Sequence, residues 1–212
     1  MNTEKHLENL NEIKQIMDRS TRFLSLSGLS GIMAGVSALV GAVLAYFVLN
    51  SGSYISGVTY FNSEVILDVR ASIFIQLLLI GAGVFCSALG FGFYFTYRKA
   101  KKESQKMWNQ ASRKLVINLA VPLIVGAVFS LILIRYNLFG LVAPVTLIFY
   151  GLACVNASHL THSEIGGIGY FNIVLGLLNA YFIGYGILFW ALGFGVLHIV
   201  YGTLMYFKYD RK

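Results

Sequence analysis

Residues Arg98–Lys114, with the sequence RKAKKESQKMWNQASRK, decide how the rest of this chain is arranged. This basic block holds seven of the sixteen lysine and arginine residues, and long apolar regions lie on both sides of it. Positive charge resists transfer across a lipid bilayer, so such a block stays in the cytoplasm and orients the apolar segments beside it. The block therefore predicts a membrane protein whose chain crosses the bilayer on both sides of residues 98–114.

The composition of the whole chain also indicates that lipid surrounds most of it. Apolar residues make up 57% and charged residues 12% of the 212 residues, against about 25% charged residues in soluble domains. The net charge of +7 does not indicate nucleic acid, because the bases lie at the ends of apolar runs and not on a basic face with interleaved aromatic residues. We expect the lipid bilayer as the main partner and no nucleic-acid partner.

Six apolar runs of about 20 residues predict six transmembrane helices, which places the protein in the all-α membrane class. The approximate spans are residues 23–49, 73–97, 115–134, 138–158, 168–183 and 187–207. They form one transmembrane domain over residues 23–207, with a tail at 208–212. Six spans put both termini on one side of the membrane. Assigning that side to the cytoplasm leaves only Arg70 and Arg135 of the sixteen bases outside, as the positive-inside rule requires.

The first 22 residues predict a separate amphipathic helix on the cytoplasmic side. Apolar side chains recur every three or four positions, at Leu7, Leu10, Ile13 and Met17, and four acids cancel four bases. A single apolar stripe of this kind suits a helix at the membrane interface or packed on other cytoplasmic ends. A dimerisation or partner-docking helix is the alternative.

The connection over residues 50–72 has two interpretations. Ser63 followed by Glu64 suits the start of a helix that continues into the second span. Alternatively, residues 64–70 form a short helix of their own at the interface. The sequence leaves both open.

Small residues predict close helix packing in the first span. Ser27, Gly31 and Gly35 are spaced at four, and such spacing lets two helix backbones approach closely. The face lies either inside the bundle or in a seam between two copies of the chain, so a homo-oligomer stays open. The pentapeptide ALGFG at residues 88–92 reappears at 191–195, which suits either a repeated helix hairpin or chance.

Two prolines interrupt the backbone hydrogen bonds of the third and fourth spans. Pro122 frees the carbonyl of Asn118, and Pro144 frees that of Gly140, because a proline nitrogen has no hydrogen to donate. In a membrane each freed carbonyl needs another partner. That partner is a neighbouring helix, water or a ligand. We expect a tolerated kink at each proline, and a break that faces a ligand is the alternative.

Four polar residues in the last three spans predict a binding pocket. Asn172 and Asn179 are seven residues apart and share a helix face, His198 lies near mid-membrane, and Asn156 lies at the end of the fourth span. Polar side chains are costly in lipid and therefore mark interior contacts or function. We expect a polar pocket that opens toward the cytoplasm. For His198 alone, a neutral imidazole bonded to a neighbouring helix is the alternative.

A second group of residues has the chemistry of metal ligands. His159, His162 and Glu164 lie within six residues, and the two imidazoles share a face if the segment is helical, so a divalent metal could bridge them. No fourth ligand is evident. The simpler interpretation is that Ser163 and Glu164 begin the fifth transmembrane helix, because Glu164 is favoured by the helix dipole.

Motifs for common chemistries are missing from the sequence. It has no Walker loop, GxSxG, HExxH or dinucleotide fingerprint. These motifs mark sites for nucleotide phosphates, a serine nucleophile, catalytic zinc and dinucleotides, respectively. We therefore expect a non-enzymatic subunit without a cofactor, which binds a small molecule or lipid or interacts with another protein. The alternative is a small transporter or channel with a cytoplasm-facing polar pocket. A membrane enzyme that uses His159, His162 and Glu164 is a third interpretation.

The hydropathy and the glycine-rich final hairpin, Gly166–Lys208, resemble those of small, uncharacterised six-helix proteins of bacterial inner membranes. The resemblance implies a location in the bacterial cytoplasmic membrane. It implies no activity, and it assigns no functional residue.

Overall fold

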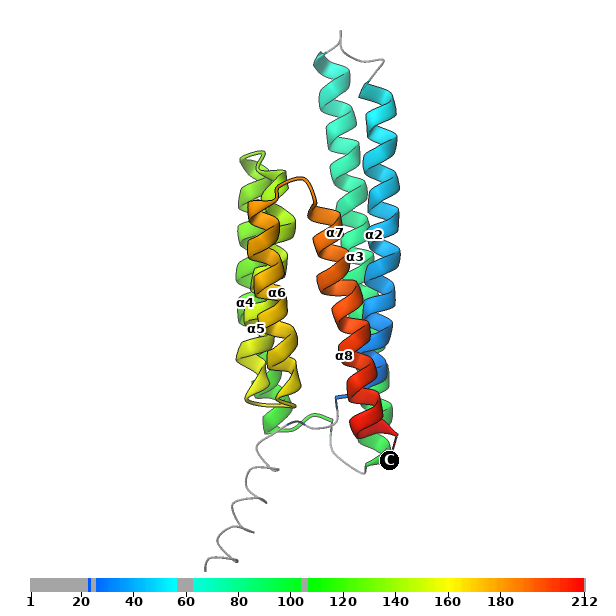
Figure 1. Ribbon diagram of the computed structural model, residues 1–212, viewed down its shortest axis with the longest axis vertical. Helices are drawn as coiled ribbons and strands as arrows, with labels where there is room; N and C mark the ends of the chain where they lie inside the picture. The colour runs from blue at the N-terminus through cyan, green and yellow to red at the C-terminus, as the bar shows by residue number, and fades with distance from the viewer. Residues whose placement is uncertain (1–22, 24–25, 57–62, 104–106, 212) are drawn as a thin grey trace, which may run out of the picture. The chain divides into compact units, whose positions relative to one another are not determined.

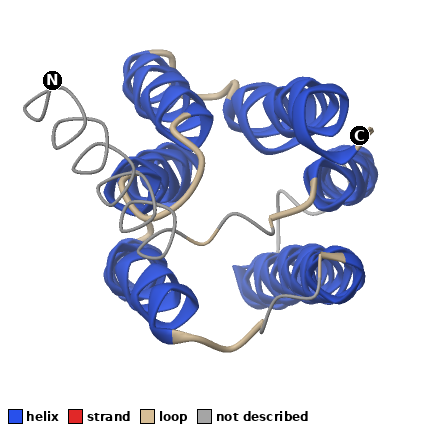
Figure 2. Ribbon diagram, turned by 90° about the horizontal axis from the view of Figure 1, so that it is seen from below, coloured by secondary structure: helices blue, strands red, loops and turns tan. Residues whose placement is uncertain are grey.

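The computed structural model describes residues 23, 26–56, 63–103 and 107–211, with the backbone alone for 51–56 and 63–71. Every regular element within these residues is a helix (Figure 2). The all-α prediction is therefore confirmed. The amphipathic helix expected over residues 1–22 lies outside the described residues.

Among the described residues, five helical segments are long and apolar enough to cross a membrane. They are Gly28–Asn50, Ser72–Lys102, Gln110–Arg135, Phe139–Ser158 and Gly186–Asp210. Helix α6 (Glu164–Tyr181) corresponds to the remaining predicted span, and its 18 residues give a length of about 27 Å. Its glutamate and two asparagines lower its mean hydropathy, so α6 is not among the five. Five candidate spans are shown, and the sixth stays a prediction.

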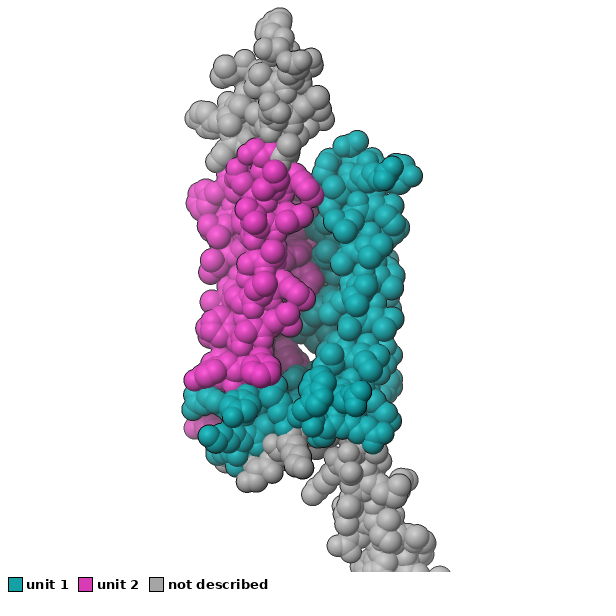
Figure 3. Space-filling model, turned by 180° about the vertical axis from the view of Figure 1, so that it is seen from behind, with its two compact units in different colours: residues 1–26, 96–177 teal, residues 27–95, 178–212 magenta. Residues whose placement is uncertain are grey.

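The chain divides into two compact units, which Figure 3 colours separately. Unit 1 comprises residues 1–26 and 96–177, and unit 2 comprises residues 27–95 and 178–212. Both units therefore contain segments that are distant in the sequence.

Unit 2 contains helix α2 (Gly28–Ser56), most of helix α3 (Ser63–Lys102) and the last helix (Figure 1). The last helix is continuous but changes type along its length. Its parts are α7 (Gly186–Trp190), the π-helix η2 (Ala191–Val196), α8 (Leu197–Met205) and the π-helix η3 (Tyr206–Asp210). Because α3 begins at Ser63 and runs on without a break, the connection follows the first of its two interpretations.

Glycines bring α2 and the last helix into backbone contact. A Cβ atom added to Gly202 would lie 2.6 Å from the carbonyl oxygen of Gly28, and one added to Gly35 would lie 2.7 Å from that of Gly195. Only glycine permits such an approach, because it has no side chain. The small-residue face predicted around Gly31 and Gly35 is thus a contact inside the chain. A homo-oligomer stays a prediction.

Helix α2 begins at Gly28, five residues after the predicted start of the first span at Phe23. The carboxylate of Asp210 accepts hydrogen bonds from Ser27 Oγ at 2.9 Å and from the backbone N of Gly28 at 2.8 Å. An anionic acceptor at this position satisfies a first-turn amide and is favoured by the helix dipole. The start of α2 is therefore fixed by a residue 182 positions away.

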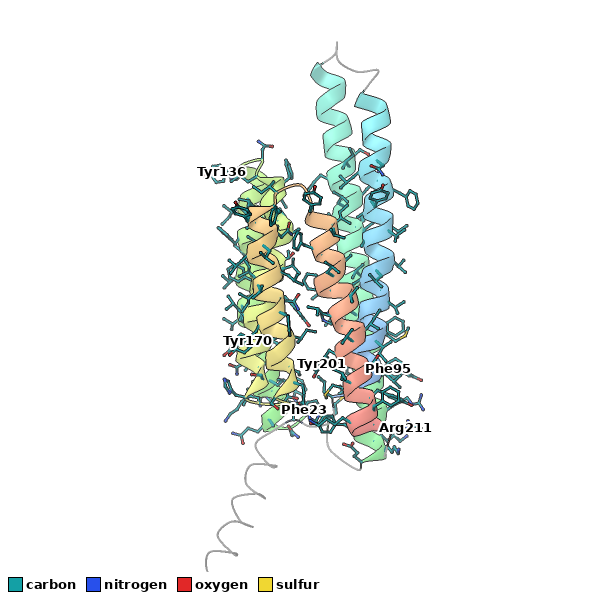
Figure 4. The ribbon with its side chains drawn as sticks, viewed as in Figure 1. Phe23, Phe95, Tyr136, Tyr170, Tyr201 and Arg211 are labelled. Atoms are coloured by element: carbon teal, nitrogen blue, oxygen red, sulfur yellow. The ribbon has the colours of Figure 1, made fainter. Side chains whose placement is uncertain are left out.

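Unit 1 contains helix α4 (Gln110–Arg135), the short 3-10 helix η1 (Phe139–Leu141), helix α5 (Val142–Ser158) and most of α6. Helices α4 and α5 pack together as a tight antiparallel hairpin. Its turn passes Tyr136, labelled in Figure 4, and Asn137, whose φ of 59° is in the left-handed region that asparagine tolerates better than most residues.

A second glycine contact joins α5 and α6. A Cβ on Gly151 would lie 2.6 Å from the carbonyl oxygen of Gly169, and a Cβ on Gly169 would lie 2.7 Å from that of Gly151. Seven residues further along α6, a Cβ on Gly176 would lie 2.9 Å from the carbonyl oxygen of Pro144. In each unit, glycines thus hold two of the described helices in backbone contact.

Candidate functional site

Helix α6 carries the two most deeply buried amides of the described residues. Asn172 and Asn179 each have 0% exposed surface. They lie seven residues apart, so they share a face of the helix and are separated by about 10.5 Å along its axis. Gly169 and Gly176 lie next to this face and contact α5. The close packing of α5 and α6 thus holds in place the helix that carries both amides.

These two amides are incompletely hydrogen-bonded. Asn172 Nδ2 donates to the carbonyl oxygen of Ile168 in its own helix at 2.9 Å. Among the described residues, Asn172 Oδ1 and both polar atoms of Asn179 have no hydrogen-bond partner. Most buried polar side-chain atoms in proteins have one, and an unmet amide is costly. This face of α6 therefore offers two acceptor oxygens and an NH₂ donor.

His198 is also buried, and it lies in unit 2 on helix α8. Its Nδ1 is 3.1 Å from the carbonyl oxygen of Gly193. A carbonyl can only accept, so Nδ1 carries the hydrogen in this contact. The ring stacks with Phe194 at a centroid distance of 6.1 Å. This hydrogen bond is thus made within the last helix itself and not to a neighbouring helix.

Asn156 makes a contact between two helices that the sequence alone does not predict. Its side chain is exposed, and its Nδ2 donates to the carbonyl oxygen of Asn118 at 3.1 Å. Asn118 is the residue whose carbonyl Pro122 leaves without a helical partner. Of the three kinds of partner considered for this carbonyl, the structure shows a neighbouring helix. Asn156 therefore links α5 to α4.

The residues with metal-ligand chemistry do not form a cluster. In the described part of the chain, no group of three or more His, Cys, Asp and Glu side chains is placed to hold a metal ion. His159 is exposed, whereas His162 is buried. Glu164 lies in the first turn of α6, where its charge suits the helix dipole.

The predicted site residues are thus distributed over both units. Asn172 and Asn179 share one face of α6, Asn156 is occupied in the α4–α5 contact, and His198 is bonded within the last helix. A common pocket of all four stays a prediction. Asn179 lies near the end of α6 that is distant from Glu164.

Sequence reasoning missed two features of the site region. One is a hollow at the start of α4, which includes Trp108 and Lys114. Its charges belong to the basic block, whose pattern indicates topology signals and lipid-headgroup contacts but does not locate a hollow. The other is Asp210, a residue of the predicted tail, which accepts a hydrogen bond from the first residue of α2.

Comparison with known proteins finds no matching protein-family model, curated protein or solved structure. The proposals below therefore depend on the residues and contacts of this chain alone.

Proposed function

We propose that this chain is a multi-pass integral membrane protein that binds a small polar molecule or a lipid headgroup through Asn172 and Asn179. It acts without catalysis, as a ligand-binding or interaction subunit. Its place is the bacterial cytoplasmic membrane, with the basic block and both termini in the cytoplasm. Positive charge at one end of the spans supports this orientation.

The observation that supports this proposal is the unmet hydrogen-bonding capacity of the α6 amides. Neither polar atom of Asn179 and only one of Asn172 has a partner among the described residues. A buried polar group without a partner costs about 1–3 kcal/mol. A ligand with hydroxyl, amide or phosphate groups would remove that cost, because it can donate to the two oxygens and accept from Asn179.

The burial of the two amides affects how fast such a ligand can enter and leave. Because neither asparagine has exposed surface, the ligand is enclosed, and the neighbours of α6 must move to admit it. Enclosure strengthens hydrogen bonds, since they form in a low-dielectric environment. The proposal thus predicts slow exchange and retention of the ligand through purification.

The substitution Asn179→Leu tests this proposal. Leucine has nearly the shape of asparagine but no polar atoms, so it removes the unmet amide at little cost in packing. We expect the free energy of unfolding in mild detergent to stay constant or to rise by about 1 kcal/mol. Native mass spectrometry should show that the variant has lost a molecule retained by the unaltered protein.

Asn156→Leu is the matched control. It removes the donor to the carbonyl oxygen of Asn118, so it should lower stability by about 1 kcal/mol and leave the bound molecule in place. The proposal is wrong if the unaltered protein carries no bound molecule. It is also wrong if Asn179→Leu retains that molecule or loses several kcal/mol, because a purely structural role would give that result.

A small transporter or channel is the second candidate. It is favoured by the two π-helical segments of the last helix, η2 and η3, of which η2 contains the hydrogen-bond partner of His198. Such segments occur frequently at functional sites. Solute flux through liposomes that contain the purified protein, and its loss in His198→Phe, would support this function.

A further inference from the structure

The start of helix α4 borders a hollow in the surface of unit 1. Its volume is about 500 Å³, and its lining residues are Trp108, Asn109, Gln110, Arg113, Lys114 and Ile117. This volume is within the range of small-molecule sites, about 300–1,000 Å³. The hollow thus has room for a lipid headgroup.

Two positive side chains, Arg113 and Lys114, border this hollow. Arg113 and Lys114 are exposed, and in the described ranges neither makes an ion pair or a side-chain hydrogen bond. Asn109 is engaged differently, because its carboxamide accepts from the backbone N of Ser112 at 2.8 Å and holds the start of α4 in place. The hollow therefore has a fixed rim and two available cations.

An apolar stripe continues from the hollow along α4. Gln110, Arg113, Lys114 and Ile117 follow the spacing of residues that share one helix face. The same face continues with Val121, Ile124 and Val128, whose side chains are 56%, 61% and 52% exposed. A molecule bound in the hollow could thus extend along α4 toward the centre of the membrane span.

We propose that this surface binds an anionic phospholipid, with its phosphate between Arg113 and Lys114 and an acyl chain along the apolar stripe. A guanidinium group holds phosphate through paired hydrogen bonds, and a lysine adds a second positive charge. The exposed indole of Trp108 suits the level of the lipid headgroups. A soluble anion would use the charges but not the stripe.

The position of the hollow in the chain agrees with this ligand. It includes the second half of the basic block, which the positive-inside rule assigns to the cytoplasmic leaflet. Anionic lipids of that leaflet attract basic residues next to transmembrane helices. The site is separate from the asparagines of α6, so neither proposal depends on the other.

The test compares lipid binding in the full-length protein and two double variants. Each protein is purified in mild detergent with equal amounts of phosphatidylglycerol and phosphatidylcholine, and bound lipid is counted by native mass spectrometry. The unaltered protein should retain phosphatidylglycerol in preference to phosphatidylcholine. In Arg113→Gln/Lys114→Gln, affinity for phosphatidylglycerol should fall about 25-fold, because each basic residue contributes about a fivefold factor.

Lys101→Gln/Lys102→Gln is the matched control, since it removes two exposed cations of the same basic block that do not line the hollow. It should leave the preference for phosphatidylglycerol within about twofold. An equal loss in both variants would overturn the proposal, because the attraction would then be a property of net charge. Equal retention of both lipids by the unaltered protein would overturn it as well.

A third measurement distinguishes a lipid from a soluble anion. Glycerol phosphate, added at the same concentration as phosphatidylglycerol, should displace less than a tenth of the bound lipid, because it has no acyl chain to lie along Ile117 and Val121. Full displacement would show that the site takes a phosphate group alone and would overturn the assignment to a lipid.

Discussion

The pentapeptide ALGFG occurs twice in this chain and has two different structures. At residues 88–92 it is part of the regular α-helix α3, and a Cβ on Gly90 or Gly92 would meet no described atom within 4 Å. At residues 191–195 it forms most of the π-helix η2, and a Cβ on Gly195 would collide with the side chain of Leu39 in α2. The same five residues thus take their conformation from the surface that packs on them.

The energetic reason is that a π-helical turn needs compensation. Such turns are rare and occur as short segments inside α-helices. Two contacts stabilise η2. It packs against α2, and the carbonyl oxygen of Gly193 accepts a hydrogen bond from the imidazole of His198. In α3 the described residues provide no such contact at Gly90 or Gly92, and the backbone keeps its α-helical hydrogen bonds.

The largest effect should come from adding one methyl group to the contact between α2 and the last helix. In Gly202→Ala the new Cβ would lie 2.5 Å from the backbone N of Ile32 and 2.6 Å from the carbonyl oxygen of Gly28. Backbone atoms cannot relieve the clash by a rotamer change, as a side chain can, so the two helices must move apart. We expect a loss of about 3 kcal/mol in the free energy of unfolding, measured by denaturant titration in mixed micelles.

Gly195→Ala is the control for this substitution within the same helix pair. Its nearest contact is the end of the Leu39 side chain, which can change rotamer, so the expected loss is about 1 kcal/mol. Equal losses in the two variants would contradict the view that backbone contact at Gly202 limits the distance between these helices.

The sequence was sufficient to predict the fold class but not which helices contact each other. Hydropathy located five candidate spans in the described residues, because these apolar runs have the length that a bilayer requires. The spacing of Gly31 and Gly35 correctly predicted a close helix contact. Gly83 and Gly90 are as regularly spaced, yet a Cβ on either would meet no described atom within 4 Å. Glycine spacing shows that a close approach is sterically allowed and does not show which partner makes it.

Intermediate effects on stability should come from replacing Asp210, whose carboxylate links the end of the last helix to the start of α2. Asp210→Ala removes the acceptor for Ser27 Oγ and for the backbone N of Gly28. Loss of such a cap costs about 1–2 kcal/mol. Hydrogen exchange should show faster exchange of the first-turn amides of α2, while amides near Gly126 in α4 keep their rates.

Asp210→Asn separates charge from hydrogen bonding in this contact. The amide oxygen can still accept from Gly28, so this variant should keep more than half of the stability that Asp210→Ala loses. If exchange at the start of α2 is unchanged in both variants, Asp210 does not determine where that helix begins.

The candidate site was predicted only in part, for reasons that differ between residues. Asn172 and Asn179 could be found because an amide in an apolar helix is costly and conspicuous. The partner of Asn156 could not, since the contact with Asn118 depends on how α4 and α5 pack. Asp210 was missed for the same reason, because its partner lies 182 residues away.

The smallest expected effect is a slight gain in stability at the unpacked copy of ALGFG. Gly90 is exposed, and the Cβ introduced by Gly90→Ala would meet no described atom within 4 Å. Alanine also loses less conformational freedom than glycine when a helix forms. We therefore expect a gain of about 0.5 kcal/mol, measured in the same micelles as Gly202→Ala, and a similar gain for Gly83→Ala.

If Gly90→Ala lowered the free energy of unfolding by 1 kcal/mol or more, the contrast between the two copies of ALGFG would be wrong. It would mean that another surface covers residues 88–92, as α2 covers residues 191–195. Cross-linking of a cysteine at position 90 would then identify that surface, because a second copy of the chain would give a dimer and an internal contact would not. Since a covered helix face tolerates no added methyl group whereas a lipid-facing one does, the sign of this small effect decides whether the two pentapeptides differ in their surroundings.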